Sequence, residues 1–107
     1  YNTALTNLIC YSNQLTSLDV SNNTALTNLR CHNNQITSLD VSNNTALRYL
    51  YCQSNLLTTN VIDNIFSDLA AGSVSNGNLT IDADRSIPGS NADKATLVGR
   101  GWTITEL

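Results

Sequence analysis

The chain has 107 residues, which is enough for one domain or part of one, and uncharged polar residues dominate it: 16 Asn, 13 Thr and 11 Ser. An apolar content of 41% with a net charge of only −3 argues against intrinsic disorder. Five basic residues against eight acidic ones argue against nucleic-acid binding, and no apolar run approaches the ~18 residues of a membrane span, so we expect no membrane insertion.

A repeat of 21 residues fills the first half of the chain. Residues 3–23 (TALTNLICYSNQLTSLDVSNN) and 24–44 (TALTNLRCHNNQITSLDVSNN) match at 17 of 21 positions, and a third copy begins at Thr45 and diverges after Thr58. A fixed period of this length is typical of a solenoid, in which each repeat packs only against its neighbours.

Each copy carries the pattern L-x-x-L-x-C-x-x-N-x-L/I. It is filled by Leu5, Leu8, Cys10, Asn13 and Leu15, then by Leu26, Leu29, Cys31, Asn34 and Ile36, then by Leu47, Leu50, Cys52, Asn55 and Leu57. Leu8 and Cys10 stand two positions apart, so their side chains leave an extended strand on the same side. We therefore expect one short strand per copy, with successive strands stacked in parallel. The pairs Asn22-Asn23 and Asn43-Asn44 are predicted to turn the chain, because Asn tolerates a left-handed backbone.

This pattern resembles the leucine-rich repeat, with Cys at the third apolar position. More narrowly, it is similar to the cysteine-bearing, 21-residue repeats of internalin J-like surface proteins and of secreted proteins of Bacteroides-type bacteria. The resemblance implies an α/β solenoid: a right-handed leucine-rich-repeat coil, a short-stranded parallel sheet on the concave face and a helix-containing C-terminal cap. It also implies an extracellular or bacterial cell-surface location. Residues 1–5 resemble the end of an earlier turn, so we expect further repeats to precede Tyr1.

The second half of the chain departs from the repeat. Residues 1–58 are predicted to hold three repeats, and residues 59–107 to form enlarged C-terminal repeats and a cap in the same domain. The elements expected there are a helix capped by Asn60 and ended by Gly72, a strand at 79–81, a loop at 85–90, a helix from Ser90 to about Val98 and a strand at 102–104. Phe66 and Trp102 are the large side chains available to close the end of the core.

The three cysteines are predicted to form a ladder of buried, reduced thiols. Cys10, Cys31 and Cys52 occupy the same repeat position, and thiols stacked in register on parallel strands do not reach the dihedral angle of a disulfide without distortion. His32 follows Cys31 and must point to the opposite face, so we expect no metal site. Asn13, Asn34 and Asn55 are predicted to be structural, with side-chain amides bonded to backbone groups of adjacent coils.

Stacked carboxylates are a weaker candidate site. Asp19 and Asp40 occupy equivalent positions, and calcium between them is conceivable. The next rung offers Val61 rather than a third carboxylate, so we expect each Asp to accept hydrogen bonds from nearby Ser and Thr groups instead. An equally weak cluster is Asp82, Asp84 and Asp93.

The composition favours recognition over catalysis. The chain has one His and one Glu and carries no nucleophile or phosphate-binding motif, so we expect neither an enzyme nor a cofactor. Tyr, Arg and His concentrate at the positions that flank the Leu and Cys of each strand, and Arg30 is expected to stack near Tyr51. The candidate binding residues of the concave face are Ile9, Tyr11, Arg30, His32, Arg48, Tyr49, Tyr51 and Gln53, which Thr80, Asp82, Thr103 and Thr105 would extend.

Two classes of function fit these observations. One is a secreted or cell-surface recognition module that binds a protein or a glycan through the concave face, since Tyr and Arg are the residues that anchor interfaces. The other is a passive spacer that displays another domain of a larger surface protein. We expect a monomer in either case, and the sequence identifies no ligand.

Overall fold

A single sheet of five parallel strands organises the molecule, and the strands follow one another in chain order. The computed structural model describes residues 4–82 and 92–107. The strands are β1 (Asn7–Ile9), β2 (Asn28–Arg30), β3 (Tyr49–Tyr51), β4 (Asn78–Ile81) and β5 (Thr103–Glu106). The first three start 21 residues apart, so each repeat supplies one strand, as its periodicity predicts.

The register of the sheet aligns the repeat positions. Leu8 pairs with Leu29, Leu29 with Leu50, and Leu50 with Leu79, which continues the row into the part of the chain where the 21-residue period is lost. The row ends at Ile104 in β5. Because alternate side chains leave a strand on opposite sides, this row fixes which face of every strand is buried.

The left-handed backbone positions differ from those predicted at the Asn pairs. Ser12, Asn33 and Ser54 each have a φ of 57° and lie just after the strands, where the chain turns out of the sheet. The turn at Asn22-Asn23 uses ordinary backbone angles and closes with a hydrogen bond from the Asn23 N–H to the Val20 carbonyl at 3.0 Å. Asn and Ser tolerate the left-handed region better than β-branched residues, which accounts for the residues chosen there.

Helix α1 (Thr59–Ala71) follows β3 and begins two residues earlier than the sequence suggests. Its N-cap is Thr58 rather than Asn60: the Thr58 hydroxyl accepts a hydrogen bond from the Val61 N–H, although the bond is long at 3.4 Å. Gly72 ends the helix, as predicted. The buried side of α1, which packs on the core, is formed by Ile62, Ile65, Phe66 and Leu69.

Helix α2 (Ala92–Gly99) packs beside α1 and leads into β5. The Ser67 hydroxyl of α1 donates a 2.7 Å hydrogen bond to the Asp93 carboxylate of α2. Trp102 is buried, and its indole N–H donates to the Val74 carbonyl at 2.8 Å. A Cβ at Gly77 would lie 2.5 Å from the Trp102 ring, so only glycine fits there. The predicted loop at 85–90 and the predicted cap Ser90 lie outside the described residues.

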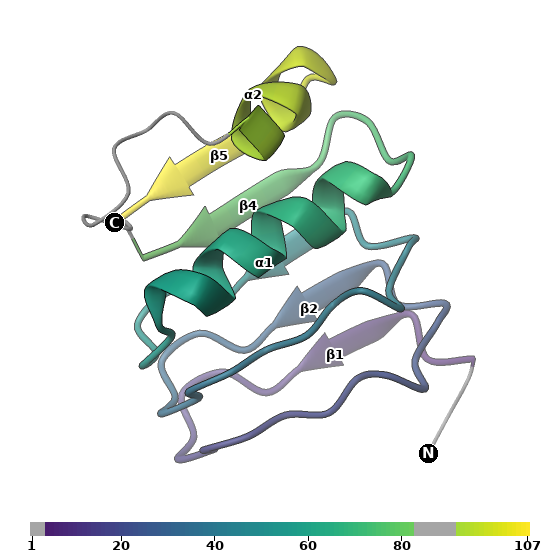
Figure 1. The fold of residues 1–107 in the computed structure, drawn as a ribbon. Helices are drawn as coiled ribbons and strands as arrows, with labels where there is room; N and C mark the ends of the chain where they lie inside the picture. The colour runs from purple at the N-terminus through teal and green to yellow at the C-terminus, as the bar shows by residue number, and fades with distance from the viewer. Residues whose placement is uncertain (1–3, 83–91) are drawn as a thin grey trace.

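The core lies between the sheet and a second layer. Figure 1 shows α1 and the extended arms that return from each repeat on one side of the sheet, while no helix of the described residues covers the other side. Leu29, Leu50 and Leu79 are fully buried between the layers, whereas their counterpart Leu8 in the first repeat is only half-buried. Within residues 4–82 and 92–107, no helix combines the length and apolarity that crossing a bilayer requires.

Candidate functional site

One face of the sheet is open along the first three strands and supports most of the candidate binding residues. We call it the open sheet face, and it corresponds to the concave face predicted from the sequence. It comprises the outward positions of the strands and the residues that continue their rows: Asn7, Ile9, Tyr11, Asn28, Arg30, His32, Tyr49, Tyr51, Gln53, Asn78, Thr80, Thr103 and Thr105. Backbone pairing extends past the strands, since the Ser12 N–H donates to the His32 carbonyl at 3.0 Å, so these rows remain aligned at Tyr11 and His32.

Four of the predicted residues form a continuous cluster on this face. The rings of Tyr11 and His32 stack with centroids 4.6 Å apart and an interplanar angle of 8°. His32 meets Tyr51 edge to face, with centroids 6.4 Å apart. The guanidinium carbon of Arg30 lies over the Tyr51 ring at 5.2 Å, which is the stacking predicted from their shared row. We call Tyr11, His32, Tyr51 and Arg30 the aromatic–arginine cluster.

The other four predicted residues surround the cluster without a ring contact to it. Ile9 and Tyr49 point outward from β1 and β3 and are exposed, and Gln53 is half-buried one position after Cys52. Arg48 is exposed but precedes β3, so the alternation of the strand does not place its side chain.

Asp82 continues the row of Tyr11, His32 and Gln53, two positions after Thr80, and its carboxylate is bound to the backbone. Its two carboxylate oxygens accept the backbone N–H groups of Ser54 at 2.9 Å and Asn55 at 3.3 Å. In the preceding repeats the N–H group of Asn13 is bound by the Asn34 side-chain oxygen at 3.1 Å, and the N–H group of Ser12 is bound by the His32 carbonyl at 3.0 Å. Asp82 therefore binds one of the two N–H groups that a repeat Asn binds, together with one that a backbone carbonyl binds elsewhere.

Several buried polar atoms in side chains of the open sheet face have no hydrogen-bond partner within the described chain. These are Arg30 Nε, His32 Nδ1, Gln53 Oε1 and Asn28 Oδ1, and all four belong to side chains of this face. Buried polar groups are nearly always paired, so their concentration on one surface is unusual. The aromatic–arginine cluster is thus held by ring stacking rather than by internal hydrogen bonds.

The predicted asparagine ladder ties adjacent coils together. The Asn34 amide nitrogen donates to the carbonyl oxygens of Cys31 in its own coil and of Cys10 in the preceding one, both at 3.0 Å. Asn55 repeats the arrangement one coil later, donating to Cys52 and Cys31. Asn13 departs from the prediction, because its amide bonds only carbonyl groups of its own coil and is exposed. Asn44 adds a second inter-coil bond that the sequence did not suggest, from its buried amide to the Val20 carbonyl at 3.0 Å.

The three thiols are free, and two of them are fully buried. Burial raises the pKa of Cys31 to about 12 and holds the pKa of Cys52 far above its ordinary value of 9.0. Cys10 is only half-buried, because it belongs to the first described coil, and burial raises its pKa as well. The prediction of buried thiols is therefore confirmed for Cys31 and Cys52 but not for Cys10.

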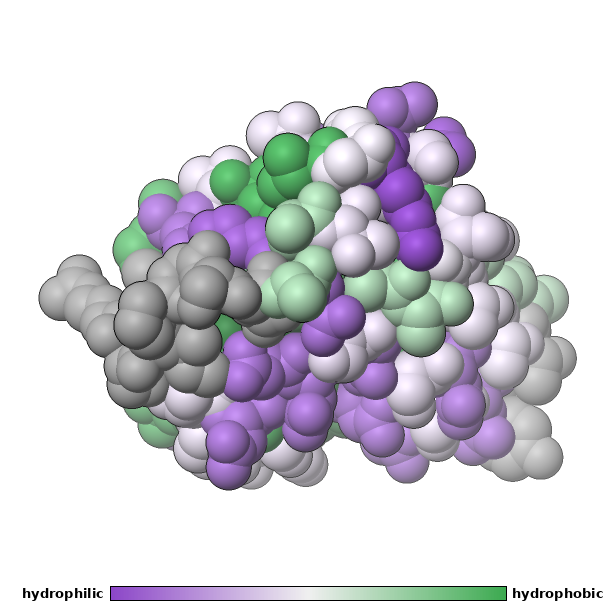
Figure 2. All heavy atoms as spheres, turned by 45° about the horizontal axis from the view of Figure 1, so that its top comes forward, coloured by the Kyte–Doolittle hydropathy of each residue, from purple (hydrophilic) through white to green (hydrophobic). Residues whose placement is uncertain are grey.

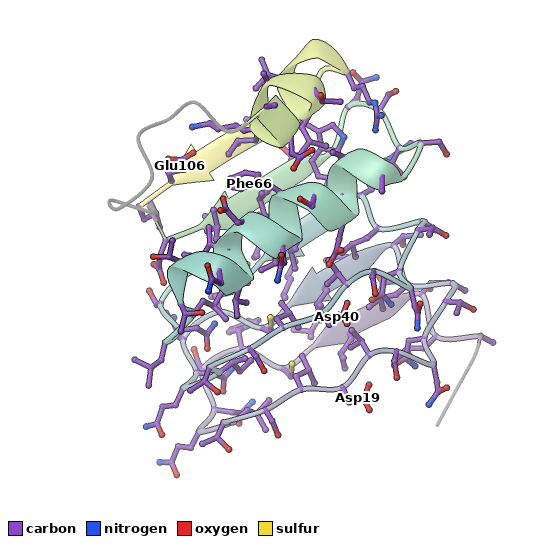
Figure 3. All side chains as sticks on the ribbon, viewed as in Figure 1. Asp19, Asp40, Phe66 and Glu106 are labelled. Carbon is purple, nitrogen blue, oxygen red and sulfur yellow. The ribbon has the colours of Figure 1, made fainter. Side chains whose placement is uncertain are left out.

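The stacked carboxylates have a neighbour that the repeat does not indicate. Asp19 and Asp40 lie on neighbouring arms (Figure 3), and they accept the N–H groups of Ser21 at 2.9 Å and Ser42 at 2.8 Å, as predicted. Hydrogen bonds from these serines lower the pKa of both carboxyl groups. The position next to Asp40 holds Asp68 as well as Val61, because α1 brings Asp68 there. An open pocket of about 290 Å³ there is lined by Ser38, Leu39, Asp40, Ser42, Val61, Asn64 and Asp68.

The Asp68 carboxyl group already accepts a hydrogen bond from the backbone. Burial, and then the charge of Asp40, raise the pKa of Asp68, while a hydrogen bond from the Val41 N–H opposes that rise. In the described ranges, no three His, Cys, Asp or Glu side chains converge on a point where a metal ion could bind. Asp84, from the second carboxylate cluster, lies outside those ranges.

Exposed apolar side chains distinguish the open sheet face further. Three of the six exposed large hydrophobic residues in the described chain, Ile9, Tyr11 and Tyr49, belong to this face. Figure 2 shows another surface, seen from the side of the helices with the α2 end brought forward, and hydrophobic side chains form small groups among polar ones there. An apolar and aromatic surface with arginine beside it has the composition of an interface core.

The sheet and its repeats fit a leucine-rich-repeat solenoid, with one parallel strand per 21-residue copy and a cysteine at a fixed position in each. No protein-family model and no curated protein sequence matches the chain. Among solved structures, the functional domain of InlJ from Listeria monocytogenes, described as including a cysteine ladder, is similar, with a TM-score of 0.48 and 25% sequence identity. The match covers 97% of this chain and 25% of the InlJ chain, so the chain spans about a quarter of that chain's length.

Proposed function

We propose that the chain is a recognition module that binds another macromolecule through its open sheet face. The observation that carries this proposal is the aromatic–arginine cluster, in which Tyr11, His32, Tyr51 and Arg30 are brought together from three successive coils. Tyr and Arg dominate the energetic centres of protein interfaces, and rings already stacked lose little conformational entropy on binding.

The scaffold beneath the cluster suits this role. Leu8, Leu29 and Leu50 point into the core from the same strands, and the asparagine ladder fixes the spacing of the coils. A rigid sheet that presents variable side chains at fixed intervals is the way in which solenoid proteins build extended binding surfaces. In this proposal residues 1–58 provide the face, and residues 59–107 are enlarged repeats and a cap that close the C-terminal end of the core.

We further propose that the module acts outside a bacterial cell, as the resemblance of its cysteine-bearing repeats implies. The two buried thiols are compatible with an oxidising environment. The thiolate is the form that reacts, and burial keeps Cys31 and Cys52 protonated and out of reach of oxidants.

Binding by wild-type and variant chains to unbiased ligand sets tests the proposal. Immobilised chains would be probed with a phage-displayed library of random peptides and with a glycan array, using the double variant Arg30→Ala/Tyr51→Ala beside the wild type. Thr37→Ala, on the exposed outer arm, is the matched control. We expect ligands that bind the wild type and Thr37→Ala and lose at least tenfold in affinity to the double variant, which corresponds to about 1.4 kcal/mol. Ligands retained by the double variant, or no ligand at all, would contradict the proposal, and the latter result would favour a passive spacer.

A further inference from the structure

Arg30 gives the open sheet face a positive charge, and the acidic side chain at its margin in the described residues, Asp82, has its carboxylate bound to backbone N–H groups. Arg30 is the one side chain with a fixed charge among the outward positions of β1 to β5. Arg48 immediately precedes β3, and the alternation of the strand does not place its side chain on this face. The ion pair found between described residues joins Lys94 to Glu106 and involves neither arginine.

The other acidic side chains lie elsewhere. Figure 3 places Asp19 and Asp40 on the arms, in the layer that contains α1. That layer and its two helices hold Asp19, Asp40, Asp63, Asp68 and Asp93. Asp82 is bound to backbone N–H groups, and Glu106 is paired with Lys94 of α2. Apart from Asp82, the described acidic side chains therefore lie away from the open sheet face, although the net charge of the chain is −3.

The cluster is arranged for a carboxylate rather than for a sugar ring. Each ring of the Tyr11–His32 pair covers one face of the other, and Arg30 lies over the Tyr51 ring, so aromatic faces on which a sugar would stack are already occupied. A guanidinium stacked on an aromatic ring keeps its N–H groups directed around its edge, where it can bind a carboxylate through two parallel hydrogen bonds. No internal bond of Arg30 has to break for this to occur.

We propose that the partner of the open sheet face is a protein segment rich in Asp and Glu, bound chiefly through Arg30. This inference depends on the recognition function proposed above and names the chemistry of its ligand. An acidic segment is attracted to this face and repelled by the opposite layer, so electrostatics also orient the encounter. Tyr11, Tyr51 and Ile9 supply apolar contact beside the charge.

Peptides recovered from the phage-displayed random library test the inference through their composition and their response to charge variants. We expect them to be enriched in Asp and Glu relative to the unselected library. Arg30→Gln, which removes the charge, should weaken their binding by at least tenfold, and Arg30→Lys should weaken it less. Raising the salt from about 0.02 to 0.3 M should also weaken binding, because the screening length falls to below 10 Å. Lys94→Gln is the matched control: it lowers the net charge equally, but Lys94 lies on α2 and pairs with Glu106.

The outcomes separate this inference from the recognition function. Peptides without acidic enrichment, or acidic peptides that bind Arg30→Gln and the wild type equally, would overturn the inference while leaving recognition intact if Tyr51→Ala still abolishes binding. Binding to glycans alone, lost in Arg30→Ala/Tyr51→Ala, would overturn it in the same way. Peptides bound equally by wild type and the double variant, or no binding of any kind, would overturn both. Circular dichroism melts of each variant should agree with the wild type, which ensures that lost binding does not reflect unfolding.

Discussion

The side-chain amide nitrogen of Asn34 lies 3.0 Å from the carbonyl oxygen of Cys10, a residue of the preceding repeat. On its other side the Asn34 oxygen accepts the N–H groups of Asn13 and Leu15 at 3.1 Å. The buried Asn34 side chain thus pairs backbone N–H and carbonyl groups that lie just beyond the ends of the strands. This bridge holds the rows of the open sheet face in register, so the geometry of the aromatic–arginine cluster depends on it.

Replacing Asn34 with Ala should destabilise the fold strongly. The substitution leaves the N–H groups of Asn13 and Leu15 without their partner and removes one of the two donors to each of the Cys10 and Cys31 carbonyl groups. Unmade bonds of this kind cost about 1–3 kcal/mol each when buried. Because some of these groups can reach water, we expect a total loss of about 2–4 kcal/mol in the free energy of unfolding, measured by urea denaturation.

Asn13→Ala is the internal control for that experiment. The Asn13 amide is exposed and bonds only carbonyl groups of its own coil, so its loss should cost less than about 1 kcal/mol. Equal losses for the two variants would show that the inter-coil bridge contributes nothing beyond the local turn.

The three thiols should react with alkylating reagents at different rates. Cys10 is half-buried, whereas Cys31 and Cys52 are fully buried with pKa values raised by desolvation, and the thiolate is the reactive form. Iodoacetamide labelling of the native chain, followed by mass spectrometry of peptides, should modify Cys10 first. All three should react after denaturation. Labelling of Cys31 as fast as Cys10 in the folded chain would rule out the buried ladder.

Asp68→Asn should stabilise the chain at neutral pH. Burial raises the pKa of Asp68, so the folded state favours its protonated form and the ionised carboxylate costs stability at pH values above that raised pKa. Asn carries no charge, so the substitution removes this cost, and the Asn side-chain oxygen can still accept a hydrogen bond from the Val41 N–H. We expect a rise of about 1–3 °C in melting temperature at pH 7, which disappears as the pH falls through the raised pKa toward the ordinary value of 3.8.

Asp19→Asn should behave differently in the same melting series. Hydrogen bonds from Ser21 lower the pKa of Asp19, so its ionised form is the one that the folded state favours, and its contribution is lost as the pH falls. We therefore expect no gain in melting temperature at pH 7. A gain equal to that of Asp68→Asn would indicate a general effect of net charge instead of a local effect at Asp68.

Calcium is expected to leave the melting temperature unchanged. Asp40 and Asp68 lie beside the same pocket, but each already accepts a backbone N–H, and no third carboxylate of the described chain joins them. Melts in millimolar calcium and in excess chelator should agree within error. An increase of several degrees with calcium, abolished in Asp40→Asn, would establish the cation site that the stacking of Asp19 and Asp40 first suggested.

The 21-residue repeat makes most of the sheet predictable from the sequence. The features that it does not predict depend on packing between residues that are far apart in the chain. Because Leu8 and Leu29 recur at the same phase, pairing and inside–outside alternation follow directly from the period, and so does the meeting of Arg30 with Tyr51. The position of Asp68 beside Asp40 could not be predicted in this way, since it depends on how α1 lies across the arms. The hydrogen bonds of Asp82 could not be predicted for the same reason: without the period, nothing in the sequence indicates that its carboxylate binds the N–H groups of Ser54 and Asn55.

The edge-to-face contact of His32 with Tyr51 crosses from one row to the next, and row-by-row reasoning does not predict it. It joins the Tyr11–His32 stack to the Arg30–Tyr51 stack, and so turns two separate pairs into a single surface. The claim that this surface recognises a partner is central to the account.

Chemical-shift mapping on the isotope-labelled chain tests that claim most directly. Backbone amide spectra would be recorded while a peptide selected from the random library is added. The account predicts that the largest shift changes fall at Ile9, Arg30, His32 and Tyr51, on the open sheet face, while Thr37 on the outer arm stays unchanged. Changes centred instead on the outer arms or on α1, with the open sheet face unaffected, would contradict it.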